Sequence, residues 1–237
     1  LAAVGFDEVW VRINPFETFA EVDLPEVMPG KPNGICLPKA EHTDEIRQLE
    51  NLLEREEKRN GIPKGSTSIV PILETAKGVA NAVAIASASP RIIQIAFGAE
   101  DYTRDIGAAR TNESLLLPRC QVVQAARIAG VQASDTVFSD VDDEDALRRE
   151  TELAKQLGFD GKGVINPRQI EIIHEVFSPT QAELAHARRV VQAALDAEEK
   201  GIGAIAIGGK MVDKPVLDRA RKLLKLAQMM NISEQQP

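Results

Sequence analysis

The sequence predicts an α/β fold with a parallel β-sheet, and three observations support this prediction. Short apolar runs rich in Ile and Val alternate with segments of helical periodicity, which is the order of repeated βα units. The two central runs, residues 68–73 and 91–97, are separated by enough chain for one crossover helix. A length of 237 residues suffices for one large α/β domain with a substantial core.

The composition excludes several classes of protein. The formal net charge is −8, and no stripe of Lys and Arg interleaved with aromatic residues is present, so we expect no nucleic-acid binding. No apolar run is long enough to cross a bilayer and no signal peptide is recognised, so we expect a cytoplasmic protein without a membrane partner. Cys36 and Cys120 are far apart, which predicts neither a disulfide framework nor a zinc site.

Two strands and one helix are predicted before the central segment. Residues 8–14 form a first strand that ends at Pro15, because proline cannot continue a strand ladder. Residues 34–39 form a second short strand. Thr43 is predicted to cap the helix that follows, and Gly61 is predicted to close it.

Two further strands and two helices are predicted after the central segment. A helix over about residues 118–129 is expected to end at Gly130. Residues 133–140 are expected to form a strand, and the acidic helix after it stops at Gly158. Residues 161–167 then form the last strand.

The C-terminal part reads as helical. Residues 178–181 match a capping box with Pro at the first helical position, which opens a long Ala-rich helix to about Lys200. Residues 201–215 are rich in Gly and apolar, and the Gly residues there favour a mobile, closely packed segment. A further helix is expected to reach about Ala227.

The predicted elements add up to six βα units. Six units form either an open doubly wound sheet or part of an eight-stranded barrel whose first two units precede Leu1 in the complete protein. Leu1 is not an initiator methionine, and residues 4–7 read like a turn from a helix into a strand, so we favour the barrel.

Two acidic residues mark the edge where the central strands end. Glu74 follows one strand and Asp101 follows the next, so they should meet at one mouth, where two carboxylates with water and substrate oxygens suit Mg²⁺. Each has a structural alternative: Glu74 as a charge near a helix that Thr75 caps, and Asp101 as a turn residue. As a pair, they favour a metal site. Glu100 is the neighbour that could be mistaken for the ligand, and Asp105 is expected to cap a helix.

Two further charged residues are candidates for the site. Arg12 lies in an otherwise apolar strand, where it either presents its guanidinium to a carboxylate at the mouth or forms a structural ion pair. Asn14 and Lys39 also end strands and are weaker candidates. Asp213, shortly before Pro215, reads on its own as a residue that starts a helix.

Five motifs, in order along nearly the whole chain, resemble those of the citrate lyase β subunits, the citryl-thioester lyases of the HpcH/HpaI aldolase superfamily. They are VRINP, PILETA, FGAEDY, FDGKGVINPRQI and GGKMVDKP, which end at Pro15, Ala76, Tyr102, Ile170 and Pro215. The resemblance implies a (β/α)₈ TIM barrel that lacks its first two βα units in this chain. Residues 1–177 would then supply strands 3 to 8, and residues 178–237 would form a C-terminal helical extension at a subunit interface.

The same resemblance implies roles for the candidate residues. Glu74 and Asp101 would hold Mg²⁺, Arg12 would grip a substrate carboxylate during catalysis, and Asp213 would be a catalytic residue that reaches the site of a neighbouring subunit. The family reaction is a retro-Claisen cleavage, in which a tertiary hydroxyl loses its proton and a carbon–carbon bond breaks. Carboxylates, a guanidinium and a divalent cation suit this chemistry, and no redox cofactor is needed.

The resemblance finally implies a substrate and partners. The substrate would be citryl carried on an acyl carrier protein, and the products oxaloacetate and an acetyl thioester, within a complex that contains an acyltransferase subunit. A homo-oligomer, trimer or hexamer, is expected. A stand-alone lyase of malyl-CoA or citramalyl-CoA, and a non-catalytic barrel that binds an acyl carrier protein, are the alternatives.

Overall fold

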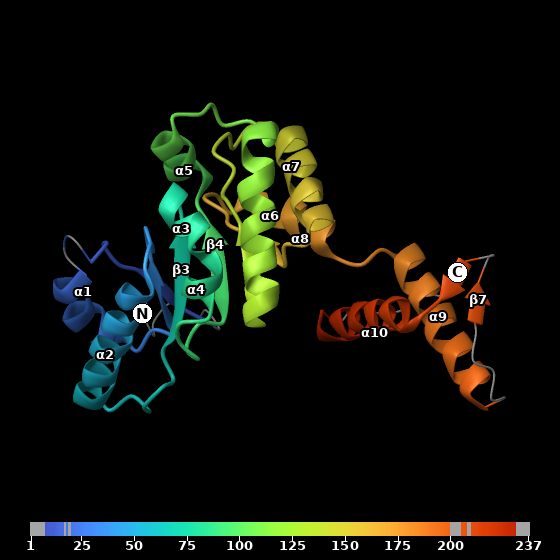
Figure 1. Ribbon diagram of the computed structural model, residues 1–237, viewed down its shortest axis with the longest axis horizontal. Helices are drawn as coiled ribbons and strands as arrows, with labels where there is room; N and C mark the ends of the chain where they lie inside the picture. Colours follow the sequence, from blue (N-terminus) through green and yellow to red (C-terminus); the bar gives the residue numbers. More distant parts are fainter. Residues whose placement is uncertain (1–7, 17, 19, 200–204, 208–209, 231–237) are drawn as a thin grey trace. The chain divides into compact units, whose positions relative to one another are not determined.

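The computed structural model describes residues 8–16, 18, 20–199, 205–207 and 210–230. The chain divides into two compact units, Leu1–Ile173 and His174–Pro237, and each is described by itself (Figure 1). Among the described helices, none combines the length and the hydropathy that crossing a membrane requires.

The first unit is built on a six-stranded sheet in which every neighbouring pair is parallel. Its strands are β1 (Trp10–Arg12), β2 (Gly34–Leu37), β3 (Ser68–Leu73), β4 (Gln94–Phe97), β5 (Gln132–Asp135) and β6 (Gly161–Lys162). The order along the sheet is the order along the chain, whereas a doubly wound sheet reverses its order. The sheet is therefore a curled half-barrel, and the C-terminal ends of all six strands share one edge.

Helices connect these strands and cover the sheet (Figure 1). They are α1 (Ala20–Val27), the 3₁₀ helix η1 (Met28–Gly30), α2 (Thr43–Asn60), α3 (Ala76–Ala80), α4 (Ala82–Ala86), α5 (Ala99–Ile106), α6 (Asn112–Ala129), α7 (Glu144–Leu157) and α8 (Arg168–Phe177). Helix α6 packs against α4, α7, β4 and β5, so it is the main cover of the second half of the sheet.

The core lies between the sheet and these helices. Its largest fully buried apolar side chains come from both layers: Leu24, Met28, Ile35, Leu37, Ile46, Leu49, Leu53, Ile69, Leu73, Ile85 and Ile95. Burial of apolar surface of this kind is the main force that holds the layers together, at roughly 25 cal/mol per Å².

Two predicted helix starts need correction. The cap of α2 is His42 and not Thr43, because Glu45 Oε2 accepts the His42 backbone N–H at 2.9 Å and completes a capping box. Helix α6 begins at Asn112 and not at Pro118, because Thr111 caps it in a second capping box. Pro118 therefore lies inside the helix.

Five predicted strands are shorter than the sequence indicated, namely those at residues 8–14, 34–39, 91–97, 133–140 and 161–167. The ladder of β5 ends at Asp135, and Thr136 and Val137 turn away to line a cavity at the strand edge. An apolar run thus continues past the strand because loop residues at this edge are also partly covered. The predicted helix ends at Gly61, Gly130 and Gly158 are confirmed, since each has a left-handed backbone.

The second unit contains α9 (Gln181–Glu199), β7 (Ile205–Ile207), β8 (Lys210–Val212) and α10 (Lys214–Met229). Strands β7 and β8 pair antiparallel, so part of the glycine-rich segment forms a strand pair that the sequence analysis did not predict. The two helices pack around Ala187, Val190 and Ala220. The capping box joins Thr180 to Glu183 instead of Ser178 to Gln181, since Glu183 Oε2 accepts the Thr180 N–H at 2.8 Å.

Candidate functional site

The C-terminal edge of the half-barrel carries an open cavity of about 320 Å³. Three predicted site residues line it: Arg12 at the end of β1, Glu74 directly after β3, and Asp101 in the first turn of α5. A second open cavity, of about 430 Å³, is also lined by Glu74 and Asp101. The carboxylates of Glu74 and Asp101 therefore line both cavities. This is expected, because residues that follow successive parallel strands meet at the same edge of the sheet.

The carboxylate of Glu74 is nearly buried, with 8% of the residue exposed. Its Oε1 accepts the backbone N–H of Lys39 at 2.9 Å. Burial and, secondly, the negative charge of Asp101 raise the pKa of Glu74, while the Lys39 N–H and the charges of Lys39 and Arg12 oppose that rise. A cation in the cavity would therefore stabilise the ionised form of Glu74.

The backbone of Lys39 is shaped to make this bond. Its φ of 50° lies in the left-handed region, which non-glycine residues seldom adopt. The left-handed turn comes directly after β2 has ended, at the residue whose N–H bonds Glu74. A strained main-chain group thus holds one oxygen of the candidate metal ligand.

Gly98 allows β3 and α5 to approach each other closely. A Cβ atom at position 98 would lie 2.6 Å from Glu74 Cβ and 2.7 Å from Glu74 Oε2. The Gly98 N–H donates to Leu73 O at 3.0 Å, and Gly98 is the N-cap of α5. Only a residue without a side chain fits between Glu74 and the helix that carries Asp101.

Asp101 lies at the N-terminal end of α5, where the helix dipole favours negative charge. Its Oδ1 accepts a hydrogen bond from Arg104 Nη2 on the next turn. The helix start is fixed from β5, because Thr136 Oγ1 accepts the Ala99 N–H at 3.0 Å. The position of Asp101 therefore depends on both β4 and the end of β5.

The donor set suits Mg²⁺. Among the described residues, Glu74 Oε2 and Asp101 Oδ2 have no protein partner, so each acid keeps one oxygen for a cation. No cluster of three or more His, Cys, Asp or Glu that could hold a metal occurs in the described ranges. Mg²⁺ is commonly held by one or two carboxylates and keeps several waters, whereas a structural Zn²⁺ site needs four protein ligands.

Arg12 is exposed at the cavity, and within the described part of the chain it forms no salt bridge. Its positive charge lowers the pKa of Glu74, which places it within electrostatic reach of the acid pair. A guanidinium in this position can receive a carboxylate in a bidentate manner.

Comparison with known proteins agrees with this geometry. Residues 1–167 match the HpcH/HpaI aldolase/citrate lyase family. The chain is 45% identical over 231 residues to citrate lyase subunit beta of Escherichia coli strain K12, which covers 96% of this chain and 76% of that protein. The chain belongs to the HpcH/HpaI aldolase/citrate lyase family. A mouse mitochondrial citramalyl-CoA lyase is 32% identical over 237 residues, covering 94% and 70%.

Solved structures extend the comparison. A citrate lyase from Burkholderia xenovorans LB400 superposes with a TM-score of 0.84 over 96% of this chain and 75% of the other; at 20% identity this similarity shows the fold alone. The protein CitE from Mycobacterium tuberculosis, in complex with magnesium, acetoacetate and coenzyme A, is 31% identical with a TM-score of 0.73, covering 92% and 78%. A citrate lyase beta subunit from M. tuberculosis, complexed with oxaloacetate and magnesium, is 27% identical with a TM-score of 0.60, covering 72% and 73%.

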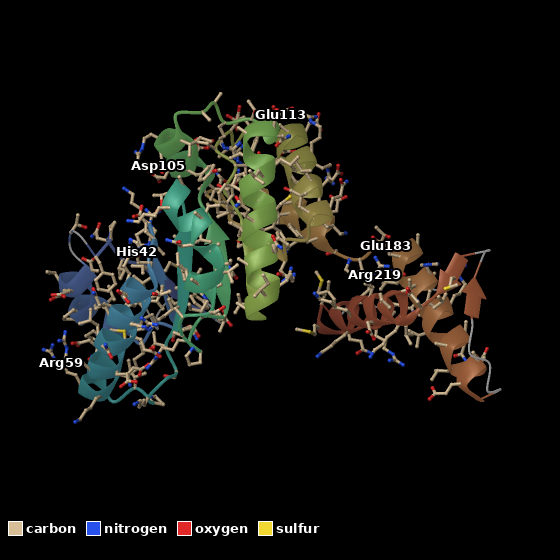
Figure 2. All side chains as sticks on the ribbon, in the orientation of Figure 1. His42, Arg59, Asp105, Glu113, Glu183 and Arg219 are labelled. Atoms are coloured by element: carbon tan, nitrogen blue, oxygen red, sulfur yellow. The ribbon has the colours of Figure 1, made fainter. Side chains whose placement is uncertain are left out.

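Glu100 and Asp105, the two other acids of α5 near the cavities, have protein partners. Glu100 Oε1 lies 2.6 Å from Arg110 Nε, so the neighbour of Asp101 is paired. Asp105, labelled in Figure 2, lies inside α5 near its end, and its Oδ2 accepts the N–H of Ala76, the first residue of α3, at 2.8 Å. The N-cap of α3 is Thr75, so the prediction of Asp105 as a helix cap is wrong.

Asp213 belongs to the second unit. It is the N-cap of α10, and its Oδ1 accepts the Val216 N–H at 3.1 Å. The prediction that it starts a helix is confirmed. Asn14, a weaker candidate, donates from its backbone N and its Nδ2 to Asp23.

Sequence reasoning missed a group of buried charges beside the cavity, here called the buried charge network: Arg110, Arg119, Asp135, Glu150 and Lys162. The side chains of Arg119 and Asp135 are fully buried, with Arg119 Nε 2.9 Å from Asp135 Oδ1. Lys162 Nζ lies 3.0 Å from Asp135 Oδ2 and 2.7 Å from Glu150 Oε1. In the sequence each is a charged residue in a segment of mixed polarity, which a surface position also explains.

Proposed function

We propose that this chain is the β subunit of a citrate lyase: a Mg²⁺-dependent carbon–carbon lyase that cleaves a citryl thioester into oxaloacetate and an acetyl thioester. The observation that carries the proposal is the convergence of Arg12, Glu74 and Asp101 on one cavity at the sheet edge. Identity of 45% to citrate lyase subunit beta across 96% of the chain supports the substrate class.

The proposed metal ligands are Glu74 and Asp101. A bound Mg²⁺ supplies Lewis-acid stabilisation of negative charge on a substrate oxygen and orients the substrate. The relatives that were solved with magnesium and a keto acid support this choice of cofactor. The Lys39 N–H keeps Glu74 Oε1 occupied, so Glu74 Oε2 is the oxygen that would bind the cation.

The other proposed roles concern charge and proton transfer. Arg12 binds a substrate carboxylate through its guanidinium and neutralises it. Asp213 of a neighbouring copy takes the proton of the tertiary hydroxyl at Oδ2, since its Oδ1 caps α10. The hydroxyl carbon then becomes the ketone of oxaloacetate, and the electrons of the broken carbon–carbon bond pass to the acetyl thioester carbon, which takes up a proton.

The wider architecture follows from the same proposal. The half-barrel is strands 3 to 8 of a (β/α)₈ barrel, and the second unit contributes to the interface of a homo-oligomer, either a trimer or a hexamer. An acyl carrier protein presents the substrate in the cytoplasm, and an acyltransferase subunit belongs to the same complex. The name "subunit beta" of the bacterial relatives supports an assembly of several chains.

A second candidate is a stand-alone lyase of citramalyl-CoA or malyl-CoA. The citramalyl-CoA lyases at 32% identity favour it, as does the coenzyme A in the CitE complex. Parallel assays with citryl, citramalyl and malyl thioesters, each on coenzyme A and on an acyl carrier protein, separate the two candidates. A non-catalytic barrel that binds the carrier protein would turn over none of them.

Substitution of Glu74 by Gln tests the proposal directly. Gln keeps an acceptor for the Lys39 N–H, so the fold should be retained while the metal loses a charged ligand. We expect turnover to fall by about 100-fold or more. Glu152→Gln, at an exposed position on α7, is the matched control and should leave turnover unchanged. Full activity of Glu74→Gln in metal-free buffer would overturn the mechanism.

A further inference from the structure

We propose that Arg110 is a positioning residue for the metal site: it ties Glu100, and through Glu100 the adjacent Asp101, to the buried charge network. The inference rests on the proposed function, because it assigns a role toward the same pair of acids. Arg110 lies in the loop between α5 and α6, and it is not among the residues that line either cavity.

The guanidinium of Arg110 is held from three directions. Its Nη1 and Nη2 donate to Glu150 Oε2 and Oε1 at 3.0 and 3.2 Å. Its Nη2 also donates to Val137 O at 3.0 Å, and its Cζ lies 6.0 Å from the centre of the Phe138 ring. Its Nε faces Glu100 Oε1 at 2.6 Å, an ion pair without the alignment of a hydrogen bond. Arg110 therefore joins α7, the loop after β5 and the start of α5.

The partner Glu150 is itself immobilised. Lys162 Nζ lies 2.7 Å and Arg119 Nη2 3.3 Å from its Oε1. Lys162 and Arg119 also clamp Asp135 at the end of β5. With Glu100 included, the network holds three cations and three anions, so it carries no surplus charge to offer a ligand. It is an anchor, and both Asp135 and Glu100 line the cavity; Glu100 is the member that adjoins Asp101 in the chain.

The first turn of α5 shows what the anchor positions. Ala99 is bonded to Thr136 Oγ1, and Glu100 contacts Arg110 and accepts a hydrogen bond from Ser139 Oγ at 3.3 Å. Asp101 is the next residue, and it faces the cavity that Glu74 lines. Two consecutive residues are thus tied to the end of β5, and this fixes the direction of the third.

A carboxylate ligand must be held to within about half an ångström to contribute fully to metal affinity. Loss of groups that orient a ligand commonly weakens metal binding by about 10- to 100-fold. We therefore expect Arg110→Met to weaken Mn²⁺ and Mg²⁺ binding by about tenfold, although residue 110 lines neither cavity. Glu100→Gln should cause a similar loss, and the double variant should lose no more than either single variant, because both changes break one connection.

The test is titration of the intact protein with Mn²⁺, followed by electron paramagnetic resonance, and with Mg²⁺, followed by calorimetry. Arg127→Met is the matched control, since Arg127 on α6 also bonds a loop carbonyl, Val131 O, at 3.2 Å and an acid, Asp160, at 2.8 Å. It lines neither cavity, and none of its hydrogen bonds among the described residues reaches α5. Its metal affinity should equal that of the unmodified protein. Arg110→Lys should recover part of the loss, because Lys keeps the positive charge. The recovery should be incomplete, because one ammonium group cannot span both Glu100 and Glu150.

Each outcome decides the matter. Unchanged metal affinity in Arg110→Met and Glu100→Gln, with normal affinity in the unmodified protein, would overturn the inference and leave the proposed function intact. Absence of metal binding in the unmodified protein would reject both. If Arg110→Met does not fold, the half-exposed Glu100 carries the test, since Glu100→Gln leaves the pairing of Arg110 with Glu150 in place.

Discussion

Two acidic regions lie at the same edge of the half-barrel, and they differ in their positive partners. In the buried charge network, Asp135 and Glu150 each have cations within about 3 Å. Burial would raise the pKa of Glu150, but the charge of Lys162 and hydrogen bonds from Arg110 and Lys162 outweigh it and lower that pKa. At the cavity, burial and Asp101 raise the pKa of Glu74. Asp135 and Glu150, with their matched cations, thus stabilise the fold. Glu74 forms no ion pair among the described residues, and Asp101 is paired only through Oδ1 with Arg104, so this pair is suited to bind a cation.

Removing a cation from the network should have the largest effect. Lys162→Met leaves two buried carboxylates short of a partner, so we expect the free energy of unfolding to fall by about 3 to 5 kcal/mol. Chemical denaturation measures this loss. Lys58→Met, at an exposed position on α2, should change stability by less than about 0.5 kcal/mol. A loss below about 1 kcal/mol for Lys162→Met would contradict the assignment of the network as a structural anchor.

Glu57 is another buried acid with a cation partner, and the pH dependence of its contribution to stability tests the comparison. Arg91 Nη1 lies 2.7 Å from Glu57 Oε1, and the amides of Gly65 and Thr67 also donate to Glu57. Burial opposes ionisation of Glu57, but these bonds outweigh it and hold its pKa at about 2. Because this pKa is depressed from 4.5, the stabilisation is present above pH 4.5 and is lost as the pH falls from 4.5 to 2.

The expected loss over that range is about 3 kcal/mol. Denaturation of the unmodified protein and of Glu57→Gln at a series of pH values measures it. The difference in stability between the two proteins should shrink as the medium becomes more acidic. An unchanged difference from pH 5 to pH 2 would show that Glu57 is not held ionised by Arg91.

A smaller effect is expected at Gly98, where the absence of a side chain leaves room for the Glu74 carboxylate. Gly98→Ala puts a methyl group within 2.7 Å of Glu74 Oε2, which should cost about 1 to 3 kcal/mol of stability and weaken metal binding. Gly161→Ala is the control, because a Cβ there meets no atom within 4 Å. Thermal unfolding and Mn²⁺ titration of both variants check the prediction. Equal behaviour of the two would mean that Glu74 can move without consequence.

The elements that repeat regularly were predictable from the sequence. Apolar runs ending at Glu74 and before Asp101 predicted neighbouring parallel strands, and the structure has β3 and β4 adjacent with both acids at one edge. Strand ends were placed too late, because Thr136 and Val137 are covered by the cavity wall and not by the ladder. The count of six βα units already favoured the eight-stranded barrel, which stays a prediction. The catalytic role of Asp213 came from family resemblance alone, since no local pattern encodes it.

The buried charge network could not be found from spacing. Arg119 and Glu150 lie on different helices, and Asp135 and Lys162 on different strands, so only the folded chain brings them together. In sequence each is one charged residue in a mixed segment, which is also the pattern of a solvated face. Finding the network would require considering complementary charges on separate helices and strands together.

The bond from Lys39 to Glu74 has an evolutionary consequence. Because the donor is a main-chain amide, any residue except proline at position 39 supplies it, provided that the backbone keeps its left-handed turn. A substitution at position 39 can therefore change the side chain, and with it the charge at the cavity rim, while the main-chain bond still orients the Glu74 carboxylate.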